Sequence, residues 1–179
     1  MSKSNTETFE DEVLESLIDD PTRSVRNIAK DLDSYRQKVW RQKKRLEEEN
    51  VIWGYTAVLD ESKLNHFLSL IFLKIKPMDE NIVSLIRDRI RYKVPGDVRI
   101  INALLVNGEY DLAVMFSAKD RATSRRYFDS IRLAYDEWLL DKPLIVDVNL
   151  ALIREGKVNP ELDKLEEFIP RADQSNSSS

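Results

Sequence analysis

The chain has 179 residues, of which 42% are hydrophobic and 34% are charged, and its net charge at neutral pH is −4. This composition is typical of a folded globular protein with one medium domain or two small ones, and it excludes a disordered chain. The absence of cysteine excludes disulfides, thiol nucleophiles and cysteine-based zinc sites. No run of about 18 apolar residues occurs and residues 1–15 are polar and acidic, so we expect a cytoplasmic protein without a signal peptide or membrane span.

Charge is distributed unevenly over the N-terminal third. Seven acids and no base lie between Glu7 and Asp20, whereas six cations and no acid lie between Arg36 and Arg45. An acidic protein is an unusual partner for a polyanion. The cationic cluster nevertheless indicates that one short segment faces an anion.

Three short helices are expected at the N-terminus. Apolar residues recur at helical spacing from Phe9 to Ile18, and Pro21 ends this first helix. Ser24 is the expected N-cap of a second helix of about two turns. A third helix is expected over 35–49, and the order of three helices with tight turns is that of a helix-turn-helix.

The third helix carries the cationic cluster. With Val39 and Leu46 taken as inward at about 100° per residue, Gln37 and most of the cations fall on the outer face, while Lys43 falls inward with its stem along the core. A solvated helix face is the commoner explanation of such a run, but the preceding two-helix unit and the missing acids favour DNA. We predict groove contacts from Arg36, Gln37, Lys38 and Arg41, phosphate contacts from Lys44 and Arg45, and include Tyr35 and Trp40 as flanking DNA-binding candidates. Trp40 lies to one side of the stripe, where packing at the edge of the core is the commoner role.

The pattern changes at Ile52. Residues 52–59 are rich in β-formers and are predicted to form a connecting strand, with a domain boundary at Asp60. The remainder predicts an α+β domain of ferredoxin-like βαββαβ order. Its predicted elements are a strand over 68–76, a helix over 81–91, strands over 98–106 and 110–116, a helix over 123–138 and a strand over 144–153. The predicted domains are therefore a helix-turn-helix at 9–59, a ferredoxin-like domain at 60–154 and an extension at 155–179, consisting of a short helix and a disordered tail.

Both faces of the first predicted strand are apolar. Leu68, Leu70 and Phe72 point one way, and Ser69, Ile71, Leu73 and Ile75 point the other. Two helices cover only one face of such a sheet. The last strand offers a similar apolar stripe at Val146, Val148, Leu150 and Leu152, so a partner sheet is implied and we expect a homodimer.

A turn is expected between the second and third predicted strands. Asn107-Gly108 is a turn signal in which glycine accepts positive φ. Asp111, three residues on, could hold the ammonium group of a ligand or tie the turn, and both roles remain open.

The chain resembles the Lrp/AsnC (feast/famine) family of transcription regulators over roughly 9–154. The resemblance rests on Val39-Trp40-Arg41, Leu46-Glu47, Val51-Ile52 and Gly54-Tyr55, and on the turn Gly108-Glu109-Tyr110-Asp111. It implies a dimer through the sheet domain, often assembled into tetramers or octamers. It also implies a small effector, often an amino acid, bound between dimers, with Gly108, Glu109, Tyr110 and Asp111 as the candidate effector-binding residues.

Four features depart from the family pattern. Tyr35 stands at the usual N-cap serine of the third helix, Ser34 stands at an apolar position and could cap instead, and Asn50 replaces a terminal glycine but tolerates the left-handed conformation. The chain also continues beyond the usual end, and Glu155–Ala172 holds apolar residues at helical spacing that predict a short extra helix.

Two other function classes compete with DNA binding as explanations of the sequence. Sirohaem decarboxylases resemble this architecture, but they would require several site histidines and the chain has only His66. No glycine-rich phosphate loop or zinc motif is present, so we expect no catalytic residue, no metal and no cofactor. The second alternative is a metabolite-binding regulatory module whose N-terminal helices contact protein instead of DNA, which the acidic first helix permits.

Overall fold

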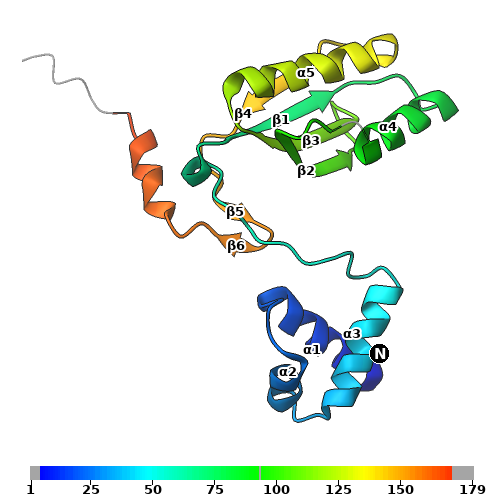
Figure 1. Ribbon diagram of the computed structural model, residues 1–179, viewed down its shortest axis with the longest axis vertical. Coiled ribbons are helices and arrows are strands. Elements are labelled where there is room, and N and C mark those ends of the chain that lie inside the picture. The colour runs from blue at the N-terminus through cyan, green and yellow to red at the C-terminus, as the bar shows by residue number, and fades with distance from the viewer. Residues whose placement is uncertain (1–4, 93, 171–179) are drawn as a thin grey trace, which may run out of the picture. The chain divides into compact units, whose positions relative to one another are not determined.

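The computed structural model describes residues 5–92 and 94–170, and it divides into two compact units that meet between Ala57 and Val58 (Figure 1). The first unit contains three helices, and the second contains a four-stranded sheet with two helices. Each unit has its own apolar core. None of the described helices is long and apolar enough to span a membrane.

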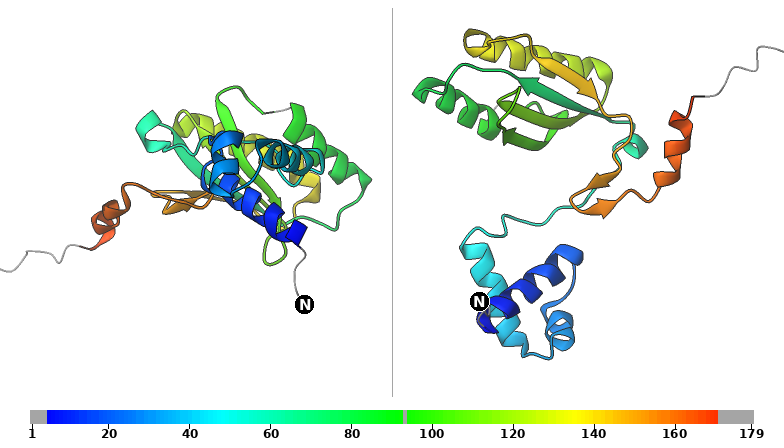
Figure 2. Two further views of the ribbon diagram at one scale, coloured as in Figure 1. Left: turned by 90° about the horizontal axis from the view of Figure 1, so that it is seen from below. Right: turned by 180° about the vertical axis from the view of Figure 1, so that it is seen from behind.

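The first unit consists of α1 (Asn5–Asp19), α2 (Val25–Asp31) and α3 (Arg36–Glu48), also visible in Figure 2. The helix-turn-helix prediction is confirmed, and α1 ends two residues before Pro21. Ser24 caps α2 as predicted, because its side chain accepts a hydrogen bond from the backbone N–H of Asn27. The core of the unit is formed by Val13, Leu17, Ile28, Ala29, Val39 and Leu46.

The two ends of α3 are formed by Tyr35 and by the turn at Asn50. Tyr35 is the N-cap residue, in an extended conformation and without a side-chain cap bond, so the alternative of a cap at Ser34 is wrong. Asn50 follows the helix with φ of 57°, the left-handed conformation that its side chain was expected to tolerate. Its position lets the N–H groups of Val51 and Ile52 bond the carbonyl of Leu46.

The expected connecting strand over 52–59 is not formed. Residues 52–60 belong to neither helix nor strand. A strand requires a neighbour to complete its hydrogen-bond ladder, and no other described segment of this chain pairs with these residues. The β-rich composition therefore gave a wrong prediction for the isolated chain.

The second unit has the predicted ferredoxin-like order. Its elements are β1 (Phe67–Leu73), α4 (Glu80–Tyr92), β2 (Val98–Leu105), β3 (Leu112–Ala118), α5 (Arg121–Tyr135) and β4 (Leu144–Asp147), with short 3-10 helices at Ser62–Leu64 and Asp136–Trp138. The strands pair antiparallel in the order β2-β3-β1-β4. α4 and α5 pack against one face, where Ile71, Leu73 and Phe116 meet Ile82, Tyr127 and Ile131 in the core.

Within the described part of the second unit, neither α4 nor α5 covers the other face of this sheet. Two rows of side chains cross it, as the strand register shows: Leu104, Ala113, Phe72 and Leu144 in one, and Asn102, Met115, Leu70 and Val146 in the next. Leu104, Leu144 and Val146 are exposed, and Leu70, Phe72 and Met115 are half-buried. The sequence prediction of a second apolar face on β1 is therefore found in the structure.

The last strand is shorter than predicted. β4 ends at Asp147, so Leu150 and Leu152 do not extend its stripe, and Val148 only donates its N–H to Leu68. The chain then forms a hairpin of β5 (Ile153–Arg154) and β6 (Lys157–Val158), turning through Glu155 and Gly156 at positive φ. The predicted extra helix is a 3-10 helix at Leu162–Phe168.

Candidate functional site

The outer face of α3 is set by two fully buried residues, Val39 and Leu46, which anchor the helix to the core of the first unit. Seven residues separate them, so both lie on one side of the helix. Gln37, Arg41 and Lys44 lie roughly opposite to them and are exposed. The structure thus places these three predicted site residues together on a solvent-facing stripe.

Two of the predicted groove residues on this helix have unengaged guanidinium groups. Arg36 and Arg41 are exposed and form no ion pair within the described part of the chain, and the Gln37 side chain is likewise without a hydrogen bond there. Such donors remain available for base edges or phosphates. Lys38 differs, because its Nζ lies 3.8 Å from the centroid of the Phe9 ring of α1.

The three cations at the C-terminal half of α3 each face an acid four residues on. Lys43 Nζ lies 3.9 Å from Glu47 Oε1, Lys44 Nζ lies 3.4 Å from Glu48 Oε1, and Arg45 Nε lies 3.6 Å from Glu49 Oε1. Arg45 also forms an ion pair with Glu10 of α1. Lys43 is half-buried beside the Tyr55 ring, in keeping with its expected inward position.

Aromatic residues flank this stripe. Tyr35, at the start of α3, is 84% exposed, and Trp40 is half-exposed with Lys44 Nζ 5.4 Å from its ring. Tyr55 donates its hydroxyl hydrogen to Glu47 Oε1 at 3.0 Å. Burial, followed by this hydrogen bond, raises the pKa of Tyr55 to about 12. Tyr55 therefore stays neutral, and its hydrogen bond holds the start of the irregular segment 52–60 against α3.

Two cations on α2 were not among the predicted site residues. Arg26 and Lys30 are exposed, lie one helical turn apart, and form no ion pair among the described residues. In a helix-turn-helix, the helix before the recognition helix crosses the DNA backbone, and α2 holds that position here. This geometry could have drawn attention to Arg26 and Lys30 in the sequence.

Comparison with known proteins gives a consistent result. No family model matches the chain. An uncharacterised HTH-type transcriptional regulator of Pyrococcus furiosus is 31% identical over 119 residues, which cover 66% of this chain and 76% of that protein. An AsnC family transcriptional regulator from Agrobacterium tumefaciens has the same fold, with a TM-score of 0.63 and 15% identity over 85% of this chain and 95% of that one. The Neisseria meningitidis regulator NMB0573, solved as a complex with L-Met, has a TM-score of 0.63 and 13% identity over 86% and 94%.

The chain belongs to a family of helix-turn-helix transcriptional regulators, and its fold is that of the Lrp/AsnC regulators of known structure. This is a family of regulators and not of enzymes, which removes the decarboxylase alternative. No group of three metal-binding side chains occurs among the described residues.

The candidate effector loop of this regulator lies between β2 and β3. Gly108 does not have positive φ, contrary to the sequence prediction. β2 ends at Leu105 and β3 begins at Leu112, so the connection is longer than predicted, and the Val106 N–H donates to the carbonyl of Asp111 across it. Glu109 is exposed, and Tyr110 packs against Phe72 with ring centroids 5.4 Å apart.

Asp111 ties this loop to the end of β1. Its Oδ2 accepts a hydrogen bond from the Ile75 N–H at 2.9 Å, and its Oδ1 lies 3.5 Å from Lys74 Nζ. Lys74 Nζ also lies 3.4 Å from the Gly108 carbonyl oxygen. The structure therefore shows Asp111 in the role of tying the turn, and ligand binding by Asp111 stays a prediction.

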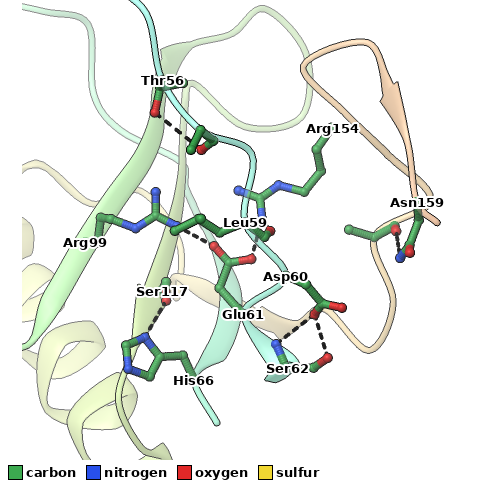
Figure 3. Close-up of polar contacts among 12 residues, drawn as sticks. Thr56, Leu59, Asp60, Glu61, Ser62, His66, Arg99, Ser117, Arg154 and Asn159 are labelled. Carbon is green, nitrogen blue, oxygen red and sulfur yellow. Dashed lines mark hydrogen bonds and ion pairs between the residues drawn. The ribbon is translucent and has the colours of Figure 1, made fainter. Parts of the chain in front are cut away.

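A buried acid joins the start of the second unit to the β5–β6 hairpin (Figure 3). Glu61 is almost fully buried and pairs with Arg99 of β2 and Arg154 of β5, and Arg154 also donates to the carbonyl of Leu59 at 2.8 Å. His66 lies nearby, with Nδ1 3.4 Å from Ser117 Oγ. A cavity of about 780 Å³ opens between residues 58–68 and 147–160. Sequence reasoning did not identify this cluster, because its three members lie far apart in the chain.

Proposed function

We propose that this Lrp/AsnC regulator binds duplex DNA sequence-specifically in the cytoplasm as a homodimer or larger assembly, with an amino acid or a similar small molecule as effector. The observation that carries the proposal is the exposed stripe of α3, where Gln37 and Arg41 have unengaged polar groups on a helix anchored by Val39 and Leu46. An α-helix fits the major groove, where such side chains distinguish base pairs.

Base and phosphate contacts are assigned to different residues of the first unit. Arg36, Gln37 and Arg41 are proposed to read base edges, with Lys38, Tyr35 and Trp40 at the margin of the contact. Lys44 and Arg45 are proposed to contact phosphates, and the positions of Arg26 and Lys30 on α2 support a further backbone contact there. The ion pairs of Lys44 and Arg45 must then be exchanged for phosphate.

The uncovered sheet face supports the proposed homodimer. It presents aliphatic residues from all four strands, and such a face is favourable in water only when it is covered. A second copy of the same face forms a closed two-fold interface without requiring any other protein. Two helix-turn-helix units would then be available for two half-sites.

The proposed effector site is the loop Gly108-Glu109-Tyr110-Asp111. Support comes from the L-Met complex of the Neisseria meningitidis regulator and from the two ionic groups beside the loop, Asp111 and Lys74. An amino acid carries an ammonium and a carboxylate group. Its ammonium group can take the place of Lys74 beside Asp111, and its carboxylate can take the place of Asp111 beside Lys74. Because Asp111 also bonds the Ile75 N–H, an effector that recruits it would loosen the end of β1.

Titration of the full chain with fluorescent duplexes tests the proposal. A duplex selected from a random library and a scrambled duplex of the same length are compared at several salt concentrations. We expect tighter binding to the selected duplex and a linear fall of log affinity with log salt for both. Equal affinity for the two duplexes would contradict sequence-specific binding, and no binding at low salt would favour the metabolite-binding module.

A further inference from the structure

Two residues in the N-terminal half of α1 contact two cations of the proposed DNA-reading helix. Lys38 and Arg45 are seven residues apart on α3, so they project from the same side, two turns apart. Lys38 lies over the Phe9 ring, and Arg45 forms an ion pair with Glu10. This side of α3 therefore already has a partner in the free protein, unlike the stripe of Gln37 and Arg41.

The contact between Glu10 and Arg45 differs from the other ion pairs of α3. Those pairs are formed within the helix, with the acid on the C-terminal side, which is the less favourable order on a helix, and Lys44 and Glu48 are both more than half exposed. Glu10 instead comes from another helix, and its side chain is only 26% exposed. It is therefore the acid that a DNA phosphate would have most difficulty in displacing.

We infer that Glu10 competes with DNA phosphate for Arg45 and thereby lowers the affinity of this regulator for every duplex. The inference rests on the proposed DNA binding and adds a means of setting its strength. When a phosphate takes Arg45, the Glu10 carboxylate loses its partner close to the polyanion. It must then bind a cation from solution or repel the DNA.

This exchange has a signature in the salt dependence of binding. A cation that meets phosphate normally releases about 0.9 counterion from DNA. If Glu10 takes up a cation at the same moment, the net release at this contact is close to zero. The Arg45 contact of the unmodified protein should therefore add almost nothing to the salt slope, although it lies at the DNA backbone.

The matched pair of variants is Glu10→Gln and Glu15→Gln. Each removes one negative charge from α1, but Glu15 is exposed, lies on another side of the helix and forms no ion pair with the described residues. We expect E10Q to bind selected and scrambled duplexes about two- to fivefold more tightly at low salt and to steepen the log–log slope by about 0.9. We expect E15Q to change affinity less than twofold and to leave the slope unchanged.

Arg45→Ala supplies a second test that does not depend on replacing Glu10. In the unmodified background it should leave the salt slope nearly unchanged, and in the E10Q background it should return the steeper slope to its original value. A slope of E10Q equal to that of the unmodified protein would overturn the inference, as would a flattening by about 0.9 in R45A alone. Absence of binding by the unmodified protein would instead contradict the proposed function.

Discussion

The two units of this regulator differ in what they leave uncovered. The helical unit has its apolar core between three helices and presents cations on the outer face of α3. The sheet unit encloses apolar residues on one face only and leaves aliphatic side chains of Leu104, Leu144 and Val146 exposed on the other. One surface suits a polyanion in water, and the other suits a second apolar surface.

The exposed surfaces of the two units therefore suit different partners. Exposed cations are stable in water and become useful when phosphate arrives, so the helical unit is complete without DNA. An exposed aliphatic sheet face is unfavourable in water, so the sheet unit is complete only when it is covered. This difference supports the proposed permanent dimer that binds DNA reversibly.

The largest expected effects come from truncating each core. Phe116→Ala removes a fully buried side chain from the sheet unit and should cost about 3–5 kcal/mol, and Leu46→Ala should cost the helical unit about 2–5 kcal/mol. Calorimetry should show each variant lowering a different unfolding transition. If both variants lower both transitions equally, the units do not fold separately and the comparison fails.

The next largest effect concerns the uncovered sheet face. Leu70→Lys places a charge at the centre of this face and should convert the dimer to a monomer at micromolar concentration. Leu133→Lys is the control, because Leu133 is 71% exposed on the solvent side of α5. Sedimentation should give a dimer for the unmodified protein and the control. A monomeric unmodified protein would remove the proposed interface.

The loop between β2 and β3 should show a moderate effect. Asp111→Ala breaks the bond to the Ile75 N–H and should destabilise the sheet unit by about 1–3 kcal/mol, while Asp111→Asn keeps an acceptor and should cost less. If the loop binds an amino acid, both variants should abolish its effect on DNA binding. An unchanged response in D111N would exclude the carboxylate charge from the effector site.

The smallest effect concerns Tyr55 and the pH dependence of the helical unit. Because the folded pKa of Tyr55, about 12, lies above the ordinary value of 10.0, its stabilising effect is present below pH 10 and is lost as pH rises toward 12. Tyr55→Phe should cost about 0.5 kcal/mol at neutral pH and should reduce the loss of stability at alkaline pH. Thermal unfolding of both proteins across this range measures the difference.

The sequence predicts those features that depend on local periodicity and turn chemistry. Ser24 as a cap, Val39 and Leu46 as the inner side of α3, and the βαββαβ order could all be recognised in this way. Three features could not, because they depend on distant partners. The β-rich residues 52–59 have no pairing strand among the described residues, β4 ends at Asp147, before the hairpin from which Arg154 pairs with Glu61, and Gly108 lacks positive φ in a connection between β2 and β3 that is longer than predicted.

The candidate site likewise has some features that depend on local periodicity and others that depend on distant partners. The exposure of Gln37 and Arg41 follows from helical phase alone, so it could be predicted. The contacts of Lys38 with Phe9 and of Arg45 with Glu10 could not, because they depend on how α1 crosses α3. The charge pattern does not distinguish the six cations between Arg36 and Arg45. The structure shows that some of them contact an acid or an aromatic ring and that others do not.

We propose above all that the outer stripe of α3 reads base sequence. The most direct test of this proposal is the ratio of affinities for a selected and a scrambled duplex, measured for the unmodified protein, Gln37→Ala, Arg41→Ala and Lys44→Ala. We expect Q37A and R41A to lose about 1–3 kcal/mol on the selected duplex only, so that the ratio falls, and K44A to weaken both duplexes equally with a flatter salt slope. A ratio left intact by both Q37A and R41A would contradict the claim.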